Sequence, residues 1–467
     1  MSAKQGTTRV LDFLYDTRWD HLPAQAQEMS VACLRDLLGV AAGALQTDAS
    51  RTIRDHALTH FSAGPTSPSS RMLFDGRAVS PSGAALAGAM AIDSLDAHDG
   101  FRPTKGHIGA WALPAVLAVA DAGDTPMEGT MDGHDLLTCL AIAYELGSRL
   151  GVAQHATVPD YHASGSWGAV GSAAVASRIL GLDAATAREA MGIAEYHSPR
   201  SQMMRCIDHP TMVKDSSGWG AMTGISSAYM AQSGFTGAPA LIVESADCEV
   251  YWESLGQQWL ICEQYFKPYP VCRWAQAAIA AARTLQVAHD FTPEMIERVE
   301  VVTFHEGCRL DHPRPTTTEQ AQYSLPFPVA AILVRGQWGA AEITTGLNDP
   351  DILNMANRIE MVEDAEYNRR FPAERLARAV INLKDGRRLE SPTTQAEGDP
   401  ETPLSADTFR TKFSDLADPM LGANTANAVW DMAESLAHGG TMQPFMDTVL
   451  SPPGGIAEQV RKTNSAA

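Results

Sequence analysis

The sequence predicts a mostly α-helical protein, with a large all-helical domain built from both chain ends and a smaller α+β domain. Apolar residues recur at helical spacing over much of the first 270 residues. Near residue 295 the pattern changes to alternating β-branched residues, which are typical of strands. Helical spacing returns after residue 400. We therefore expect a helical domain of residues 1–274 and 396–467, and an α+β domain of residues 275–395.

The helices of the large domain are predicted from apolar spacing and from residues that begin or end helices. We expect helices at residues 29–42, 82–95, 136–150, 169–180 and 184–194, the last with Asp183 as its N-cap. Residues 108–120 predict a buried helix, since this apolar run is too short to span a bilayer. Small residues at 168–181 predict helices that pack backbone to backbone.

The smaller domain is predicted from one alternating segment and one hairpin. "IERVEVVTFHEGC" predicts a strand, and "LARAVINLKDGRRLESPTT" predicts two strands joined at Asp385-Gly386. Between them, residues 326–335 and those that follow predict helix. Helices at 406–416 and 425–436 come next, and residues 451–467 predict a frayed tail.

Composition restricts the class of partner. The formal net charge of −20 argues against nucleic acid and anionic membranes, but it leaves room for a small anionic substrate in a local basic pocket. The N-terminal residues contain no apolar segment of signal-peptide length. The seven cysteines are scattered and include no C-x-x-C pair, so neither a disulfide framework nor a zinc ribbon fits. A reducing cytoplasm is the simplest setting.

Polar and charged residues precede small or apolar runs in four stretches. These are "DAHDGFRPTKGHIGAW", "PDYHASGSWGAVGSAA", "RCIDHPTMVKDSSGWGAM" and "FKPYPVCRWAQAAI". Helix starts rich in small residues favour a bound anion, because unpaired N–H groups and the helix dipole face it. Two such starts lie beside His162 and Lys214, which suggests a pocket for carboxylates.

Other site types fit less well. There is no G-x-S-x-G elbow, no G-x-G-x-x-G after a predicted strand and no Walker A lysine. Asp96, His98, Asp99 and His107 could hold a metal, but their spacing matches no standard ligand set, so we expect none. Cys272 is expected to be a core residue and not a catalytic thiol.

Together with "GFTG" and "QYSLPFPVAAIL", these stretches occur in one order over about residues 80–335. The set resembles the MmgE/PrpD superfamily of 2-methylcitrate dehydratase, cis-aconitate decarboxylase and iminodisuccinate epimerase-like enzymes. The resemblance implies a helical domain and an α+β lid domain, with the site in the cleft between them. It also implies that no cofactor is needed and that the enzyme is a homodimer.

The resemblance carries over to named residues. Its catalytic positions correspond to Asp96, His107, His162 and Lys214. Three positions depart from the decarboxylase pattern. This chain has Gly100 where the pattern has Thr, Gln276 where it has His, and Phe327 where it has Tyr. The basic insertion "RPTKG" also differs from the usual turn. These departures argue against aconitate decarboxylation in particular.

Chemistry next to a carboxylate assigns roles to these residues. Removing a proton there creates an enediolate-like charge, which fixed cations must stabilise. We expect Lys214 to do this, His107 and His162 to act as general acid and base, and Asp96 to orient a histidine or hold the proton. Expected substrate-binding residues are Arg102, Lys105, Tyr161, Arg205, Arg273 and Gln276.

The sequence thus predicts a cofactor-independent, dehydratase-like lyase acting on a small di- or tricarboxylic acid. Three alternatives stay open: an epimerase of a dicarboxylate, a decarboxylase, and a non-catalytic homologue that only binds carboxylates.

Overall fold

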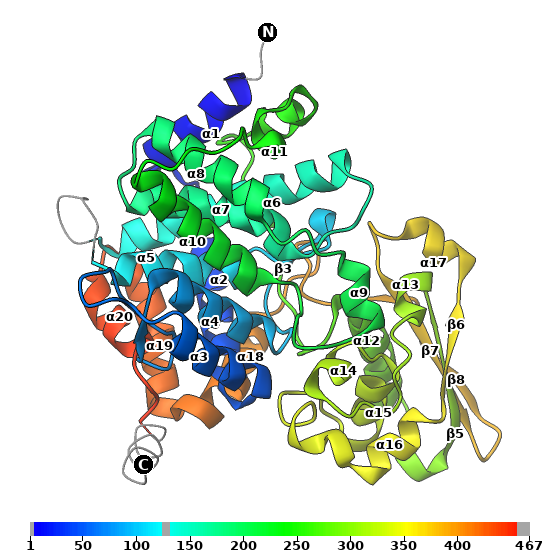
Figure 1. The fold of residues 1–467 in the computed structure, drawn as a ribbon. Helices are drawn as coiled ribbons and strands as arrows, with labels where there is room; N and C mark the ends of the chain where they lie inside the picture. Colours follow the sequence, from blue (N-terminus) through cyan, green and yellow to red (C-terminus); the bar gives the residue numbers. More distant parts are fainter. Residues whose placement is uncertain (1–3, 124–130, 455–467) are drawn as a thin grey trace.

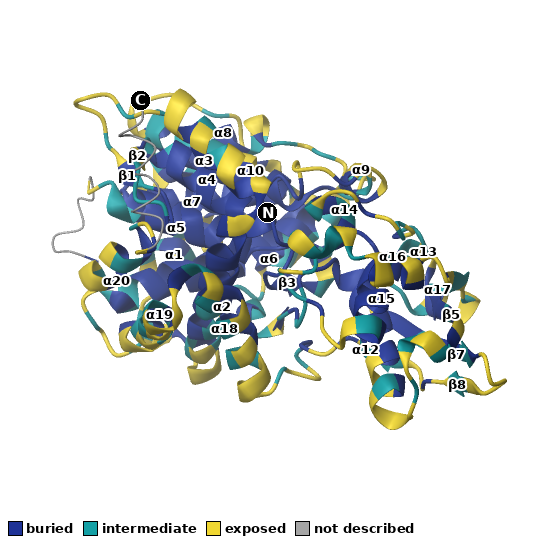
Figure 2. Ribbon diagram, turned by 90° about the horizontal axis from the view of Figure 1, so that it is seen from below, coloured by how far each residue is buried: buried dark blue, intermediate teal, exposed yellow. Residues whose placement is uncertain are grey.

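Helices dominate the structure, a computed structural model that describes residues 4–123 and 131–454. Figure 1 shows a large helical body and a smaller lobe that carries the main sheet. The prediction of a mostly α protein is confirmed. Figure 2 shows that buried residues concentrate in the central helices of the body, while exposed residues lie on the outer helices and loops.

The centre of the body consists of five helices that contact one another: α4 (Pro81–Asp93), α5 (Gly109–Asp121), α6 (Gly133–Thr157), α7 (Ser164–Ile179) and α10 (Ser217–Gln232). Around them lie α1 (Lys4–Asp16), α2 (Ala24–Gly43), α3 (Asp48–His60), α8 (Ala184–His197), α9 (Met203–Asp208) and α11 (Leu241–Glu244). Two short antiparallel pairs complete this part, β1 (Ser70–Arg71) with β2 (Ala78–Val79) and β3 (Gly100–Phe101) with β4 (Gln264–Tyr265).

Small residues let α7 and α10 approach closely, as the sequence predicted. A Cβ atom on Gly220 would lie 2.6 Å from the Cα atom of Gly165 on the facing helix. The Asp183 side chain caps α8 by accepting a hydrogen bond from the Thr186 amide at 2.8 Å, also as predicted. This close packing fixes the two helix starts that carry candidate site residues.

The helix α6 is longer than predicted, because it begins at a capping box between Asp132 and Asp135 and continues to Thr157. By length and composition alone it could cross a membrane. Its surroundings are protein, however, since it packs against α2, α5 and α7 and most of its residues are buried.

The smaller lobe is a five-stranded sheet covered by helices. Its strand order is β6 (Ile359–Glu363), β5 (Ile296–Thr303), β7 (Leu376–Leu383) and β8 (Arg388–Glu390), with β9 (Thr394–Gln395) also paired to β7. The β5–β6 pair is parallel and the others are antiparallel. The helices are α12 (Arg273–Ala288), α13 (His305–Cys308), α14 (Thr318–Gln322), α15 (Pro326–Arg335), α16 (Pro350–Ala356) and α17 (Ala365–Arg370).

The strand and hairpin predictions for this lobe are confirmed, with Asp385-Gly386 at the turn between β7 and β8. The prediction that the helix continues after residue 335 was wrong, because α15 ends at Arg335. Gly336 adopts a left-handed conformation (φ +75°) and ends α15, because glycine takes this backbone geometry without a Cβ clash. The chain returns to α-helix only at Pro350.

The last helices return to the body. They are α18 (Ala406–Leu421), α19 (Ala423–Leu436) and α20 (Met442–Val449). Both α18 and α19 pack against α2. Lys412 on α18 pairs with Asp36 of α2 and donates to the Ala97 carbonyl at 2.7 Å. The domain limits at residues 274 and 396 stay a prediction, and most of the predicted tail lies outside the described residues.

Candidate active site

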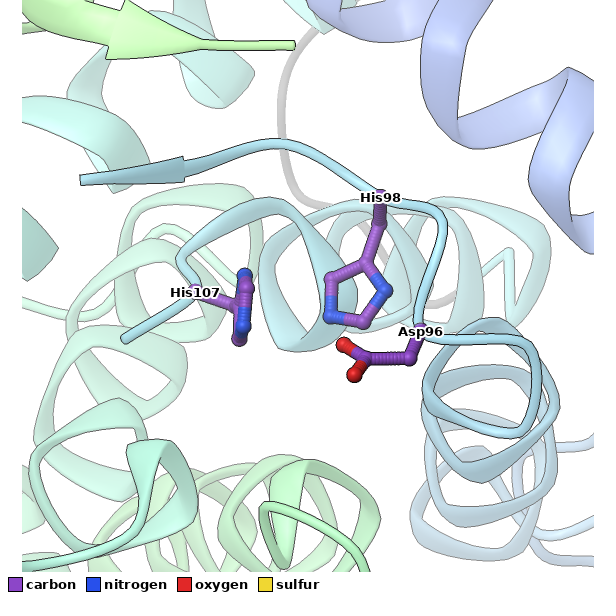
Figure 3. Close-up of side chains that lie close together, drawn as sticks. All are labelled: Asp96, His98 and His107. Atoms are coloured by element: carbon purple, nitrogen blue, oxygen red, sulfur yellow. The ribbon is translucent and has the colours of Figure 1, made fainter. Parts of the chain in front are cut away.

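The candidate site is built on the loop that follows α4. Asp96 lies in the left-handed region of backbone space, with φ +51°, which an aspartate tolerates better than most residues. Figure 3 shows that the Asp96, His98 and His107 side chains gather at one point. All three residues are at least nine-tenths buried. The apolar helix α5 begins two residues after His107 and fixes the end of this loop.

Asp96 is held between two lysines. The Lys267 ammonium lies 2.5 Å from Asp96 Oδ1 and 2.9 Å from its carbonyl oxygen. The Lys214 ammonium lies 4.0 Å from Asp96 Oδ2. Burial raises the pKa of the Asp96 carboxyl, but the charges of Lys267 and Lys214 outweigh burial and bring this pKa below its usual range. Asp96 is therefore an ionised carboxylate that holds two ammonium groups in the interior.

Lys214 is positioned by the smaller lobe. Its ammonium donates to the Gln322 side-chain oxygen and lies 4.4 Å from the centre of the Tyr323 ring. Gln322 in turn donates to the Ser94 carbonyl at 2.6 Å. The "QYSLP" segment therefore connects this lysine to the loop that carries Asp96.

His107 has one free ring nitrogen. Its Nδ1 lies 2.5 Å from the Asp99 carbonyl oxygen, and because a carbonyl only accepts, Nδ1 carries the proton. Nε2 then holds the lone pair and lies 3.7 Å from Asp215 Oδ2. Burial, followed by the charge of Lys267, lowers the pKa of His107 to about 3. At neutral pH this imidazole is uncharged and can accept a proton at Nε2.

Asp215 is suited to share a proton with His107. Ser164 donates a hydrogen bond to Asp215 Oδ2 at 3.0 Å and accepts one from the His107 backbone amide at 3.0 Å. Burial raises the pKa of the Asp215 carboxyl to about 6, against the opposing influence of His107. Its carboxyl therefore changes protonation near physiological pH.

His98 completes this cluster of titratable groups. Its ring centre lies 4.3 Å from that of His107, and its Nε2 lies 3.3 Å from Asp93 Oδ1. Asp96, His98 and His107 could offer one ligand atom each to a metal, within 4.8 Å of one another. A cation there would have to displace the Lys267 ammonium from Asp96, and the two lysine charges oppose it. The donor set therefore fits proton transfer better than metal binding.

A small buried cavity of about 30 Å³ opens onto these groups. Both lobes line it. Its charged lining residues are the cations Lys105, Lys267, Arg273 and Arg375 and the carboxylates Asp96 and Asp215. The lining cations exceed the carboxylates, in a chain whose net charge is −20. This local excess favours an anionic ligand.

The structure brings together six of the residues that the sequence singled out. Asp96, Lys105, His107, Tyr161 and Arg273 line the cavity, and Lys214 contacts Asp96 at its edge. The hydroxyl of Tyr161 donates to the Lys105 carbonyl, and the Lys105 ammonium lies 4.4 Å from the centre of the Tyr161 ring. These contacts join the second polar stretch to the basic insertion.

The other four predicted residues do not line this cavity. His162 Nδ1 donates to the Asp160 carbonyl at 2.8 Å, and Arg205 is exposed on α9. Arg102 pairs with Glu401. Gln276 donates to two backbone carbonyls of the loop before α12, at 2.8 and 3.0 Å.

Arg273 lines the cavity but already has partners. Its guanidinium lies 2.9 Å from Asp399 and donates to the carbonyls of Glu397 and Ala396 at 2.8 and 3.2 Å. It therefore braces the segment that leads back to the helical body. Phe327, one of the departures from the decarboxylase pattern, is buried in the lobe with its ring centre 5.6 Å from that of Trp338.

Sequence reasoning assigned no role to five residues of the cavity region: Asp215, Tyr265, Lys267, Tyr323 and Arg375. Lys267 and Tyr323 lie within motifs that were quoted, and Asp215 follows Lys214 directly. Their position within the quoted motifs could have identified these three residues as candidates. Arg375 lies far along the chain at the start of β7, where the sequence gives no sign of a site.

Comparison with known proteins assigns both parts of the chain to one family. The MmgE/PrpD N-terminal domain matches residues 8–257, and the MmgE/PrpD C-terminal domain matches residues 269–438. Human cis-aconitate decarboxylase is 26% identical over 388 residues, which cover 76% of this chain and 75% of that protein. The mouse protein of the same name is 25% identical over 464 residues, covering 93% and 91%. Cis-aconitate decarboxylase of Aspergillus terreus is 20% identical over 419 residues, covering 82% and 84%.

The two family models together span most of the chain, including every cavity residue except Tyr265 and Lys267, which lie in the short interval between the models. The chain belongs to the MmgE/PrpD family, whose cis-aconitate decarboxylase members are lyases.

Proposed function

We propose that this protein is a cofactor-independent hydro-lyase that removes water from a small di- or tricarboxylic acid. One observation carries the proposal. A neutral imidazole with a free nitrogen, His107, lies 3.7 Å from a carboxyl group of raised pKa, Asp215, in a buried cavity with an excess of cations. A base and an acid side by side are what an elimination of water needs.

In the first step, His107 Nε2 removes a proton from the carbon next to a substrate carboxylate. The electron pair of the broken C–H bond moves toward that carboxylate and gives it enediolate character. Lys267 and Lys214 lie on the Asp96 side of the cavity, where their positive charges would stabilise this oxyanion. Fixed charges in a buried site act without reorganisation of solvent, which makes this a large catalytic contribution.

In the second step, the carbon–oxygen bond β to the carboxylate breaks and Asp215 gives its proton to the leaving hydroxyl. Water and an alkene result. His107 is then protonated and Asp215 is ionised, so the two groups form an ion pair across the same 3.7 Å. Transfer of the proton from His107 Nε2 back to Asp215 restores the starting state.

Decarboxylation is the second candidate, and the names of the relatives favour it. In that reaction a carbon–carbon bond breaks, CO2 leaves, and the same lysines stabilise the resulting carbanion. Asp215 then supplies a proton to carbon. The two reactions share the cation cluster and differ in the bond that breaks.

Proton NMR in D2O separates these possibilities. Purified protein is incubated with 2-methylcitrate, citrate, cis-aconitate or iminodisuccinate. A hydro-lyase gives new olefinic signals with deuterium exchange next to the carboxylate, whereas a decarboxylase releases CO2. Exchange without a new product would indicate an epimerase. Absence of exchange and of turnover over the whole panel would count against the proposal and for a homologue that only binds carboxylates.

His107→Gln is the critical variant for this assay, because it keeps a polar side chain and removes the base. We expect exchange and product formation to fall by about 100-fold or more. His305→Gln is the matched control, since His305 is exposed on the smaller lobe and pairs with Glu363 at 2.9 Å. Full activity in His107→Gln would refute the assignment of His107.

We also propose that the protein acts as a homodimer in the cytoplasm. Support for a second copy comes from large apolar side chains that are exposed on or beside α8, α10 and α11: Tyr196, Trp219, Phe235 and Leu241. The seven free thiols suit a reducing compartment. Sedimentation velocity tests the dimer, and a monomer at micromolar concentration would contradict it.

A further inference from the structure

Arg375 is a buried cation that forms no ion pair with the residues that the structure describes. It lies directly before β7, lines the cavity, and is 5% exposed. Its Nε and Nη1 find no hydrogen-bond partner in the part of the chain that the structure describes. Its Nη2 makes one long contact, 3.5 Å to the Arg102 carbonyl oxygen.

Several other buried cations pair with a carboxylate, whereas Arg178 donates instead to the backbone carbonyls of Leu14 and Thr17. Lys267 pairs with Asp96, Arg273 with Asp399, Lys412 with Asp36 and Arg149 with Glu145. Arg375 forms no such pair with any residue in 4–123 or 131–454. Leaving a buried charge unpaired is strongly unfavourable, so a buried cation normally has an anion beside it. Arg375 also lacks the carbonyl contacts that serve Arg178, so a bound anion is the partner that best suits it.

The aromatic ring of Tyr265 lies beside the guanidinium of Arg375. The guanidinium carbon of Arg375 lies 5.6 Å from the centre of the Tyr265 ring, and that of Arg273 lies 4.6 Å from it. Tyr265 is opposite Gly100 in the β3–β4 pair. A Cβ atom on residue 100 would lie 2.5 Å from the Tyr265 ring carbon Cζ, which no real structure tolerates. Gly100 therefore leaves the room that this ring occupies.

Lys105 adds a second cation on the same side. Its backbone is left-handed (φ +50°), and its ammonium lies over the Tyr161 ring. It forms no ion pair with the residues that the structure describes. Lys105 comes from the helical body and Arg375 from the smaller lobe, so an anion between them would contact both.

We propose that Arg375, with Lys105, binds a second carboxylate of the substrate, distinct from the carboxylate that faces Lys267 and Lys214. The inference rests on the proposed function and specifies its substrate class as an acid with at least two carboxylates. Nε and Nη1 of this guanidinium lack a partner among the described residues and Nη2 has only its 3.5 Å contact, so the group has N–H donors available for carboxylate oxygens. Arg375 is thus a substrate-binding residue, and a monocarboxylate leaves it unpaired.

Isothermal titration calorimetry on the full-length protein tests this inference without turnover. The probes are citrate, cis-aconitate and succinate, with propionate as the monocarboxylate. Arg375→Gln is expected to weaken binding of the tightest di- or tricarboxylate by roughly 10- to 100-fold, the usual effect of losing hydrogen bonds to a charged group. Binding of propionate should change less than twofold.

Two further variants complete the design. Arg375→Lys keeps the charge and loses the planar fork, so it should bind more weakly than the native protein and more tightly than Arg375→Gln. Arg378→Gln is the matched control, because Arg378 lies close by on β7 but pairs with Glu390 at 2.5 Å. It should bind every probe as the native protein does. Thermal melts confirm that each variant is folded, and the lysine variant decides if the glutamine variant unfolds.

The outcomes separate the inference from the proposed function. If Arg375→Gln or Arg375→Lys binds citrate as tightly as Arg378→Gln does, the second carboxylate site is wrong, while proton exchange by the native protein still supports the lyase. If both variants lose propionate and citrate equally, Arg375 is structural and the inference also fails. If the native protein binds none of the probes and exchanges no protons, both the inference and the proposed function fail.

Discussion

Replacing Gly100 with alanine tests whether the Tyr265 ring is fixed where the structure places it. The new Cβ atom would lie 2.5 Å from Tyr265 Cζ and 3.0 Å from His107 Nδ1. The flanking backbone is tied down, because Gly100 pairs with Tyr265 in the β3–β4 ladder. The clash is therefore with a side chain that lines the cavity, and the ring must retreat.

The size of the effect follows from these distances. Ordinary van der Waals contact begins near 3.4 Å, so the ring must move by about 1 Å. Overpacking of this kind usually destabilises by about 1–3 kcal/mol. Because the entropy of unfolding grows with chain length, that corresponds to a fall of only about 1–3 °C in Tm. Activity is the more sensitive measurement, since a misplacement of about 1 Å in an active site can lower the rate by about 100-fold.

The assay is kcat/KM on whichever carboxylate the NMR panel identifies, measured for Gly100→Ala, Tyr265→Ala and the double variant. Gly339→Ala is the control, because a Cβ atom there meets nothing closer than 3.5 Å. We expect Gly100→Ala to lose about 100-fold alone and much less in the Tyr265→Ala background, since only the 3.0 Å contact with His107 Nδ1 then remains. Native activity in Gly100→Ala, or the same loss in both backgrounds, would refute the reasoning.

Three further predictions concern protons and stability. His107→Asn should retain carboxylate binding in calorimetry and lose about 100-fold or more in kcat, because it removes the base but little volume; an unchanged kcat would exclude this role. In the free enzyme, kcat/KM should fall as pH rises above about 6, where the Asp215 carboxyl loses the proton it donates, and Asp215→Asn should abolish that limb. A pH profile that keeps the limb in the variant would exclude Asp215. Lys412→Met should destabilise the protein by about 3–5 kcal/mol in denaturant unfolding, because Asp36 is left buried and unpaired, and a second change, Asp36→Leu, should restore most of the loss. A double variant no more stable than the single one would contradict this explanation.

Local patterns were sufficient to predict most of the fold. The small-residue helix starts of α7 and α10, the cap at Asp183 and the turn at Asp385-Gly386 are each specified within a few residues of sequence. The parallel pairing of β6 with β5 could not be predicted, because it joins segments some 60 residues apart and the β6 sequence has little alternation. The prediction that the helix continues beyond Arg335 was wrong, because Gly336 favours the left-handed geometry that ends α15.

The residues of the candidate site also fall into those that sequence motifs indicate and those that only the structure reveals. Asp96, His107 and Lys214 could be proposed from sequence because each lies in a motif that resembles the family, and the structure places them close together. Arg375 could not be identified from sequence, since no motif surrounds it. It stands out in the structure because its guanidinium forms no ion pair with the described residues. An unpaired guanidinium is recognisable only when every neighbour is placed. His162 and Gln276 stay predictions; in the structure their ring or amide nitrogens donate to nearby backbone carbonyls.

The position of Asp96 explains how the two buried lysines, Lys267 and Lys214, can lie close together without a bound substrate. Lys267 and Lys214 would repel each other in a buried site, and Asp96 neutralises one of the two charges. A substrate carboxylate must therefore compete with Asp96 for the same ammonium groups, which weakens binding of the ground state. As negative charge grows on the substrate during proton removal, that competition shifts toward the substrate. Binding that strengthens only as charge develops is the kind that accelerates a reaction, so in the proposed mechanism Asp96 would contribute to catalysis without touching the proton.

The cavity size adds a requirement for motion. A space of about 30 Å³ holds roughly one water molecule and no dicarboxylate. Asp96 and His107 belong to the helical body, whereas Arg375 and Tyr323 belong to the smaller lobe. In the proposed mechanism, a substrate that bridges these groups would enter as the two sets of residues move apart and would be enclosed as they return. The two carboxylates would then serve different purposes: one would carry the developing charge, and the other would draw the lobes together through Arg375.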